Sequence, residues 1–301
     1  MARRTNAGPL KWRGLLLHLT HYDPRWWEKK SRERRYDQAT AAAVIKAMAE
    51  VRMNLLIIDI ADAIVYKTLP HLRKPYSVPM SQLTELAGLA RDHGLEVVPK
   101  LNFARSPRHR HSHWLDPNQS DPDRATFWKQ GFAAIDEVLD AVGGARMVHV
   151  GMDEDDTRSP EQYAAALTRL YRGLKRRKVR MAMWAEVGHE SWRPQQRWKE
   201  IPAIKQLPRD VLLMPWSYKS VMADWTRRLK RWGFDVVPGC QYGHPSLPEK
   251  DALTNVREWA DTAQSIPLDG LLLTKWINCS RRNRPALLRA VRASGPLMAG
   301  G

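Results

Sequence analysis

An apolar segment runs directly into four consecutive acids at residues 148–156, which read VHVGMDEDD. Paired carboxylates can divide acid catalysis: a protonated one donates to a leaving oxygen, while an ionised one stabilises a developing cation. Burial against aromatic rings raises the pKa of the proton donor and keeps it neutral. Asp153 and Glu154 are therefore the candidate catalytic residues, and we expect Asp155 and Asp156 to be solvated or to cap a helix.

The acids end one of eight short apolar runs that alternate with longer amphipathic stretches. The runs cover residues 14–22, 54–60, 95–102, 147–154, 179–186, 211–218, 234–242 and 270–278. Continuous apolar runs of this length are typical of strands buried on both faces of a parallel sheet. The stretches between them predict helices at 37–52, 81–94, 124–141 and 159–177, and shorter ones at about 198–206, 220–232, 250–264 and 284–292. Ser81 and Ser159 are the expected caps of two of these helices.

Eight strand–helix units in 301 residues predict a (β/α)8 TIM barrel. We expect one catalytic domain over residues 1–301, with its barrel core at about 14–292 and no separate N-terminal domain. A doubly wound open sheet is the alternative architecture. It normally carries a glycine-rich phosphate loop after the first strand, whereas here that strand continues into HLTHYDPRWW (18–27).

Polar and aromatic residues collect at the carboxyl ends of the predicted strands, where barrels place their active sites. A mouth with paired carboxylates and aromatic walls suits a carbohydrate, because aromatic faces stack on the C–H faces of a sugar ring. The candidate substrate-binding residues at these ends are His21, Asp62, His149, Trp184, Trp216, Tyr242, Trp276 and Asn278.

The segment HVGMDE (149–154) resembles the His-x-Gly-Gly-Asp-Glu motif of glycoside hydrolase family 20, the β-N-acetylhexosaminidases, whose catalytic domain is a (β/α)8 barrel. NLLIIDIAD (54–62) and HGLEVVPKLN (93–102) are similar to the second and third strands of that family. Tryptophans at the ends of strands five, six and eight occupy the places of its sugar-box tryptophans. The resemblance covers about residues 14 to 278.

This resemblance implies a substrate-assisted mechanism, in which the 2-acetamido oxygen of the sugar attacks the anomeric carbon. Asp153 would orient the acetamido group, and Glu154 would be the general acid and then the base. Tyr242 would hold the acetamido oxygen, and His149 would support the acid pair. Neighbouring side chains in a strand point to opposite faces, so both acids reach one sugar only if the strand ends or bulges at Asp153.

The sequence also departs from the family pattern. Met152 replaces the second glycine, His21 stands near the usual arginine of the first strand, and Lys100 replaces the usual glutamate of the third. Asn278 replaces the glutamate that often ends the eighth strand. These changes favour one rival hypothesis, a barrel of this type that binds glycan without cleaving it.

A net charge of +17, from 49 Lys and Arg against 32 Asp and Glu, attracts polyanions non-specifically. A polyanion-binding or nucleic-acid-binding barrel is therefore the second rival, although the basic residues are spread along the chain and predict no specific nucleic-acid partner. The segment RSPRHRHSH (105–113) leaves the third strand and could form a basic lid that favours an anionic or sulfated glycan. Its histidines 109, 111 and 113 have no acidic partner nearby in the sequence, so we expect neither a metal nor a cofactor.

Other features bear on location. No apolar run reaches the roughly 18 residues of a membrane span, and no signal peptide is visible at the N-terminus. The two cysteines, Cys240 and Cys279, are too few for a disulfide framework. We expect inert buried thiols, a cytoplasmic location and no membrane partner. The sugar, its linkage and the oligomeric state carry no sequence signal.

Overall fold

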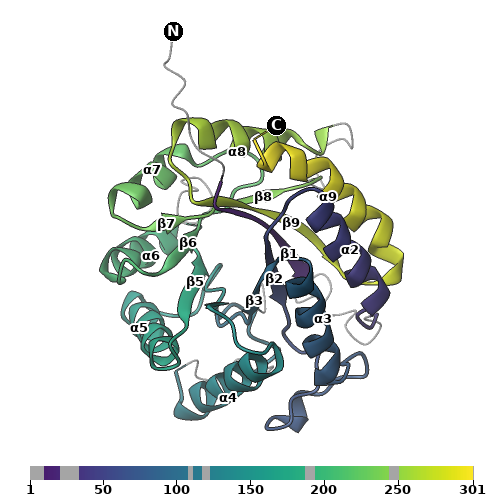
Figure 1. Cartoon of the computed structure of the whole chain (residues 1–301). Helices are drawn as coiled ribbons and strands as arrows, with labels where there is room; N and C mark the ends of the chain where they lie inside the picture. The colour runs from purple at the N-terminus through teal and green to yellow at the C-terminus, as the bar shows by residue number, and fades with distance from the viewer. Residues whose placement is uncertain are drawn as a thin grey trace.

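The computed structural model describes residues 10–20, 34–107, 111–116, 123–186, 194–243 and 251–300, with the backbone alone at 194–198. These residues form one parallel sheet that curls into a barrel, with the helices around its outside (Figure 1). The strands are β1 (Trp12–His18), β2 (Leu55–Asp59), β3 (Glu96–Lys100), β4 (Met147–His149), β5 (Arg180–Trp184), β6 (Leu212–Met214), β7 (Asp235–Val236), β8 (Gly239–Gln241) and β9 (Gly270–Asn278). The helices are α2 (Gln38–Glu50), α3 (Met80–Asp92), α4 (Ala125–Ala141), α5 (Pro160–Arg176), α6 (Pro194–Gln206), α7 (Ala223–Arg231), α8 (Thr254–Ser265) and α9 (Arg284–Met298), with short 3-10 turns η2 (Pro70–Leu72) and η4 (Arg281–Asn283).

The seventh predicted strand, 234–242, is divided at Pro238 into β7 and β8, and this division closes the barrel. β7 pairs with β6 on one side, and β8 pairs with β9 on the other. The two ladders continue across the break, because Val237 donates to the Leu213 carbonyl (3.0 Å) and the Pro238 carbonyl accepts from Leu272 (2.9 Å). β7 and β8 together occupy one strand position, so the (β/α)8 barrel prediction is confirmed.

The continuous apolar runs are explained by burial on both strand faces. Leu15, Leu17 and Ile58 face the helices, whereas Leu16 and Ile57 belong to a second cluster inside the barrel. That inner cluster also contains Trp184, and the partly buried side chains of Trp216 and Trp276 pack against it. The barrel is therefore a packed core with aromatic residues at one end.

Several element ends differ from the prediction. Helix α3 begins at Met80 after Pro79, so the predicted cap at Ser81 is wrong. The predicted Ser159 cap is confirmed, because Ser159 and Gln162 form a capping box. Helix α9 continues past the predicted end at 292 to Met298, because its last turns are buried and Gly295 lies against Val51.

In the residues that the structure covers, no helix combines the length and apolar character that crossing a membrane requires. The described residues form one barrel, and the single-domain organisation of residues 1–301 stays a prediction.

The start of β9 yields a stability prediction. A Cβ at Gly270 would lie 2.2 Å from the backbone carbonyl oxygen of Trp12, the residue with which Gly270 pairs. Gly270→Ala should lower the free energy of unfolding by about 2 kcal/mol or more, because neither backbone can move without breaking the ladder. Gly88→Ala in α3 has nothing within 4 Å of the new methyl, so it should raise stability by about 0.5–1 kcal/mol. Urea unfolding measures both, and an unchanged midpoint for Gly270→Ala would contradict the prediction.

Candidate active site

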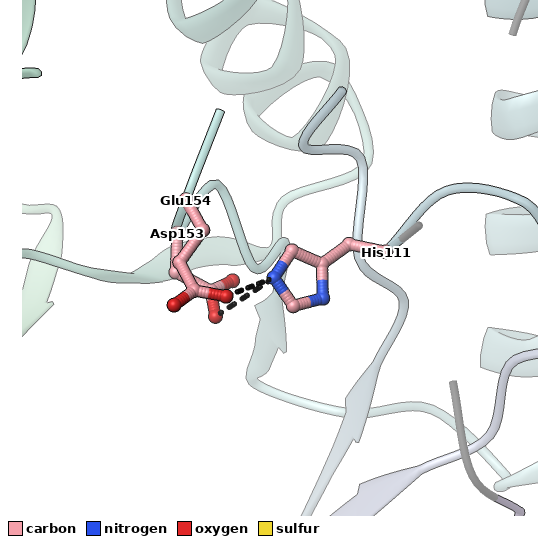
Figure 2. Close-up of side chains that lie close together, drawn as sticks. All are labelled: His111, Asp153 and Glu154. Carbon is pink, nitrogen blue, oxygen red and sulfur yellow. Dashed lines mark hydrogen bonds and ion pairs between the residues drawn. The ribbon is translucent and has the colours of Figure 1, made fainter. Parts of the chain in front are cut away.

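The acid pair lies on a sharply bent loop that follows β4. The strand ends at His149, and Gly151 (φ 71°), Met152 (φ 71°) and Glu154 (φ 53°) all have left-handed backbone. Residues other than glycine rarely adopt this backbone conformation. The bend turns Asp153 and Glu154 toward the same histidine, as Figure 2 shows. The sequence requires the strand to end or bulge at Asp153 if both acids are to reach one sugar. The strand ends before Asp153, so this requirement is met.

Asn102, just after β3, holds this bend. Its Oδ1 accepts hydrogen bonds from the backbone N–H groups of Met152 (3.1 Å) and Ala104 (3.0 Å), and its Nδ2 donates to Asp153 Oδ1 (2.7 Å). A Cβ at Gly151 would lie 2.0 Å from Asn102 Oδ1. The first glycine of the motif is therefore required by the close approach of Asn102 as well as by its φ.

His149 supports the loop from below. Its Nδ1 accepts the backbone N–H of Gly151 (3.1 Å), and its ring packs edge-on against Trp184 at 4.7 Å. Burial lowers the pKa of His149 well below its ordinary value, and the Lys100 charge lowers it further. A neutral, fully buried His149 fits the predicted supporting role.

His111 is the site residue that sequence reasoning missed. Its Nε2 lies 2.9 Å from Glu154 Oε2 and 3.6 Å from Asp153 Oδ2 (Figure 2). Burial alone would lower the pKa of His111, but the Asp153 and Glu154 carboxyls outweigh it and raise the pKa above its ordinary value. The alternating histidines of 109–113 were the available signal. The nearest acid in the sequence is Asp116, whereas the two acids that His111 contacts come from the loop after β4.

A third carboxyl fixes the backbone of the pair. The N–H of Glu154 donates to Glu186 Oε1 at 2.7 Å, and Glu186 follows the end of β5. The Tyr163 hydroxyl of α5 donates to the Met152 carbonyl at 3.0 Å. Both peptide groups that flank Asp153 are therefore held by side chains from other elements.

Asp155 is a buried ionic centre and not a solvated loop residue. Its Oδ1 accepts the N–H of Arg158 (3.1 Å) within the loop, its side chain is fully buried, and α5 is capped by Ser159 instead, so the expectation of a solvated or helix-capping Asp155 is wrong. Arg158 Nη1 reaches Asp155 Oδ2 at 2.5 Å, and Lys199 Nζ lies 3.2 Å from Oδ1. The expectation of solvation is correct for Asp156, which is exposed and accepts from the Ser106 hydroxyl.

The aromatic candidates divide into a core side chain and a partly exposed group. Trp184 is 1% exposed and belongs to the core inside the barrel, where it packs against His149. Trp216 stacks on Tyr218 at 5.1 Å, and Tyr218 meets Trp276 edge-on at 6.2 Å. Burial raises the pKa of the Tyr218 hydroxyl, and the Asp153 and Glu154 charges contribute to that rise. The charges of the acid pair therefore act on Tyr218, which connects Trp216 and Trp276 into one aromatic wall.

Lys100, which replaces the family glutamate, is used inside the barrel. It is fully buried and donates to Asp59 Oδ2 at 2.8 Å, and the same oxygen lies 2.9 Å from His18 Nδ1. Burial would raise the pKa of Asp59, but Lys100 and His18 outweigh it and hold the pKa well below its ordinary value. The ion cluster of Asp59, Lys100 and His18 adjoins Trp276, because the ring centres of His18 and Trp276 are 4.8 Å apart.

The remaining candidates are distributed around the same end of the barrel. Asp62 is fully buried and accepts the Tyr76 hydroxyl (2.7 Å), and Asn278 Oδ1 accepts from Asn283 Nδ2 (2.8 Å). Both side chains thus have bonds to their own loops. Tyr242 is partly exposed, with Lys275 Nζ 5.5 Å from its ring. His21 lies outside the described residues, as does His109.

Comparison with known proteins defines the class of this fold. No protein-family model matches the sequence, and no curated protein does so. Solved structures match nearly the whole chain. They include the GH20 exo-β-N-acetylglucosaminidase of Vibrio harveyi in complex with N-acetylglucosamine (TM-score 0.67, 15% identity, 96% of this chain and 54% of that chain). The GH20 β-N-acetylhexosaminidase of Streptomyces coelicolor A3(2) has a TM-score of 0.69 at 14% identity, over 97% of this chain and 64% of that chain.

Dispersin B matches with a TM-score of 0.65 and 15% identity, and the alignment covers 96% of this chain and 98% of that chain. The chain thus spans 54% and 64% of the length of the first two structures and nearly all of dispersin B. At such identities the likeness establishes the fold. The chain has a (β/α)8 barrel similar to those of the GH20 structures, at low sequence identity.

The Asp155 cluster predicts a contrast between neighbouring acids. Asp155→Asn removes the charge that compensates the buried Arg158 and Lys199, so it should lower the free energy of unfolding by about 3 kcal/mol or more. Asp156→Asn changes an exposed side chain and should cost less than about 1 kcal/mol. Chemical denaturation of both variants tests this, and equal effects would contradict the assignment of Asp155 as the ionic centre.

The raised pKa of His111 predicts a pH-dependent stability. The folded protein binds this proton more tightly than the unfolded chain, so the contribution is complete below the ordinary histidine pKa of about 6.5. It is lost as the pH rises through the higher folded pKa. The stability difference between wild type and His111→Gln should therefore shrink above about pH 6.5. His93→Gln, at an exposed histidine that ends α3, is the control. A difference that grows with pH would oppose the prediction.

Proposed function

We propose that the chain is a retaining glycoside hydrolase that acts on N-acetylhexosaminides by substrate-assisted catalysis. The observation that carries the proposal is the convergence of Asp153, Glu154 and His111 at the carboxyl end of the barrel. The aromatic wall of Trp216, Tyr218 and Trp276, whose residues follow β6 or lie near the end of β9 at the same end of the barrel, would provide stacking surface for a sugar ring.

Asp153 is suited to hold the acetamido group. Asn102 binds its Oδ1, which directs Oδ2 toward the site. In the first step the acetamido oxygen attacks the anomeric carbon, and the bond to the leaving oxygen breaks. The ionised Asp153 accepts the acetamido N–H and stabilises the positive charge that develops on the ring being formed. No protein nucleophile is needed, which explains why the two acids can be neighbours in sequence.

Glu154 is suited to move the proton. It donates to the leaving oxygen in the first step and takes a proton from water in the second, when water opens the intermediate. Between the steps it is a carboxylate, and a protonated His111 at 2.9 Å stabilises that form. Oxygens of Asp153 and Glu154 lie within 4.8 Å of each other, so both carboxyls can contact one sugar residue. Retention follows from the proposed attack by the acetamido oxygen, because two successive displacements at the anomeric carbon restore its configuration.

The solved relatives support the choice of sugar. The Vibrio harveyi enzyme was crystallised with N-acetylglucosamine, and a variant of Streptomyces plicatus β-hexosaminidase with its product GlcNAc. We therefore propose a terminal N-acetylhexosamine as the substrate of this chain. The net charge of +17 and the basic segment 105–113 support a glycan that carries anionic or sulfate groups.

A barrel that binds glycan without cleaving it is the second candidate. Lys100 and Asn278, which replace hydroxyl-reading glutamates of the resembled family, bond to Asp59 and Asn283. Side chains in such internal contacts leave fewer groups to orient the sugar for reaction. This rival predicts saturable binding of N-acetylhexosamine with no turnover.

Release of the chromophore from an aryl N-acetyl-β-hexosaminide tests the proposal. Wild type should turn over, and Glu154→Gln should lower kcat by roughly 10²–10⁴-fold with a weakly activated aryl leaving group, because no proton reaches the leaving oxygen and no carboxylate takes the proton of the attacking water. Glu161→Gln, an exposed acid in the first turn of α5, should match wild type. An aryl glycoside with a 2-hydroxyl in place of the acetamido group should not be cleaved.

Three outcomes count against the proposal. Turnover that survives Glu154→Gln excludes this residue as the acid, and cleavage of the 2-hydroxyl substrate excludes assistance by the acetamido group. Binding without turnover by wild type favours the glycan-binding rival. For the polyanion rival, DNA association should fall steeply with salt and show no base preference, which would indicate adhesion through charge alone.

A further inference from the structure

Three potential metal ligands converge where the acid pair meets the loop after β3. His111 Nε2 lies 2.9 Å from Glu154 Oε2 and 3.6 Å from Asp153 Oδ2, and one ligand atom from each residue lies within 4.8 Å of the others (Figure 2). Tetrahedral Zn²⁺ with bonds of about 2.0–2.2 Å holds its ligands about 3.3 Å apart. The distances from His111 Nε2 to Glu154 Oε2 and to Asp153 Oδ2 fall on either side of that value. Small side-chain rotations would therefore bring all three atoms to bonding distance of one ion.

The Asp153 carboxylate is already oriented for such a role, because Asn102 Nδ2 donates to its Oδ1 and leaves Oδ2 facing His111. The backbone of Glu154 is held by Glu186. Metal-binding carboxylates in proteins are usually oriented by hydrogen bonds of this kind. Two carboxylates and a neutral imidazole together neutralise a divalent cation, which compensates for removing it from water.

The donor set favours some ions over others. One imidazole and two carboxylates suit Zn²⁺, Co²⁺ or Mn²⁺, whereas Ca²⁺ takes six to eight oxygen ligands and Mg²⁺ keeps several waters. The three side chains are 5–11% exposed, which leaves a small ion a route to them. Three protein ligands also leave a fourth position for water.

We propose that His111, Asp153 and Glu154 bind a divalent transition-metal ion, with Zn²⁺ as the probe, and that this ion excludes substrate from the acid pair. The inhibitory consequence rests on the proposed hydrolase function, and the binding itself does not. A bound ion occupies Glu154 Oε2, the oxygen nearest His111, and blocks proton donation through it. It also occupies Asp153 Oδ2, the oxygen assigned to the acetamido group.

Calorimetric titration of the untagged, chelator-treated full chain with ZnCl₂ tests the binding. Wild type should bind one ion saturably, and His111→Gln should weaken that binding by at least about tenfold, as loss of a ligand requires. His93→Gln removes an exposed histidine outside the cluster and should bind like wild type. Zn²⁺ should also raise the Tm of wild type and His93→Gln more than that of His111→Gln. Glu154→Gln is a second variant with the same expected loss, should His111→Gln fail to fold.

Absence of saturable binding by wild type, or equal affinity in wild type and His111→Gln, would overturn the inference. The two proposals fail separately. If the aryl substrate is not cleaved but Zn²⁺ binding depends on His111, the metal site stands and the hydrolase function falls. If cleavage depends on Glu154 but saturating Zn²⁺ leaves the rate unchanged, the hydrolase function stands and the inhibitory site falls.

Discussion

The close approach of the Asn102 amide to Gly151 is the contact on which the site depends. The amide fills the space that any Cβ at 151 would need, and it takes up the N–H of Met152 and one oxygen of Asp153. Because these bonds pull the chain away from a strand path, β4 stops at His149 and the backbone turns left-handed at Met152 and Glu154. In an extended strand, the side chains of Asp153 and Glu154 would point to opposite faces. In the bent loop, both carboxyls face His111.

Charge is arranged differently around the acid pair than around three other buried acids. Asp59 is matched by Lys100, Asp155 by Arg158 and Lys199, and Asp116 by Arg105, so these acids have permanently cationic partners. The contacts described for Asp153 and Glu154 come from the Asn102 amide, from His111 and from the Glu186 carboxyl, which accepts the Glu154 N–H. A permanent cation would hold a carboxyl ionised, whereas a histidine can gain or lose its proton near neutral pH. The pair therefore lies among groups that permit a proton to move.

The sequence predicted those features that local pattern determines. Burial on both strand faces leaves continuous apolar runs such as 54–60, and their alternation with helices predicts the barrel. Asp153 and Glu154 were visible because they follow such a run directly. His111 was not, because it lies 43 residues from Glu154 and only tertiary structure joins them. The burial of Asp155 likewise depends on Lys199, which a separate helix contributes. The break at Pro238 depends on which neighbour each half of that strand pairs with, and apolar pattern carries no information on pairing.

The ladders of the barrel are uneven around its circumference. β2 pairs with β3 from Leu55↔Glu96 to Asp59↔Lys100, and β1 has similarly long ladders with β2 and β9. The ladders of β4 and β6 are shorter: β3 pairs with β4 at Lys100↔His149, and β6 pairs with β7 at Leu212↔Asp235 and Leu213↔Val236. Short ladders open more easily than long ones, so the part of the sheet formed by β9, β1, β2 and β3 is stiffer than the part from β4 to β7. Asn102 follows β3 in the stiffer part, whereas the acid loop follows β4. The hydrogen bonds of Asn102 with Met152 and Asp153 therefore anchor the acid loop to the stiffer part of the barrel.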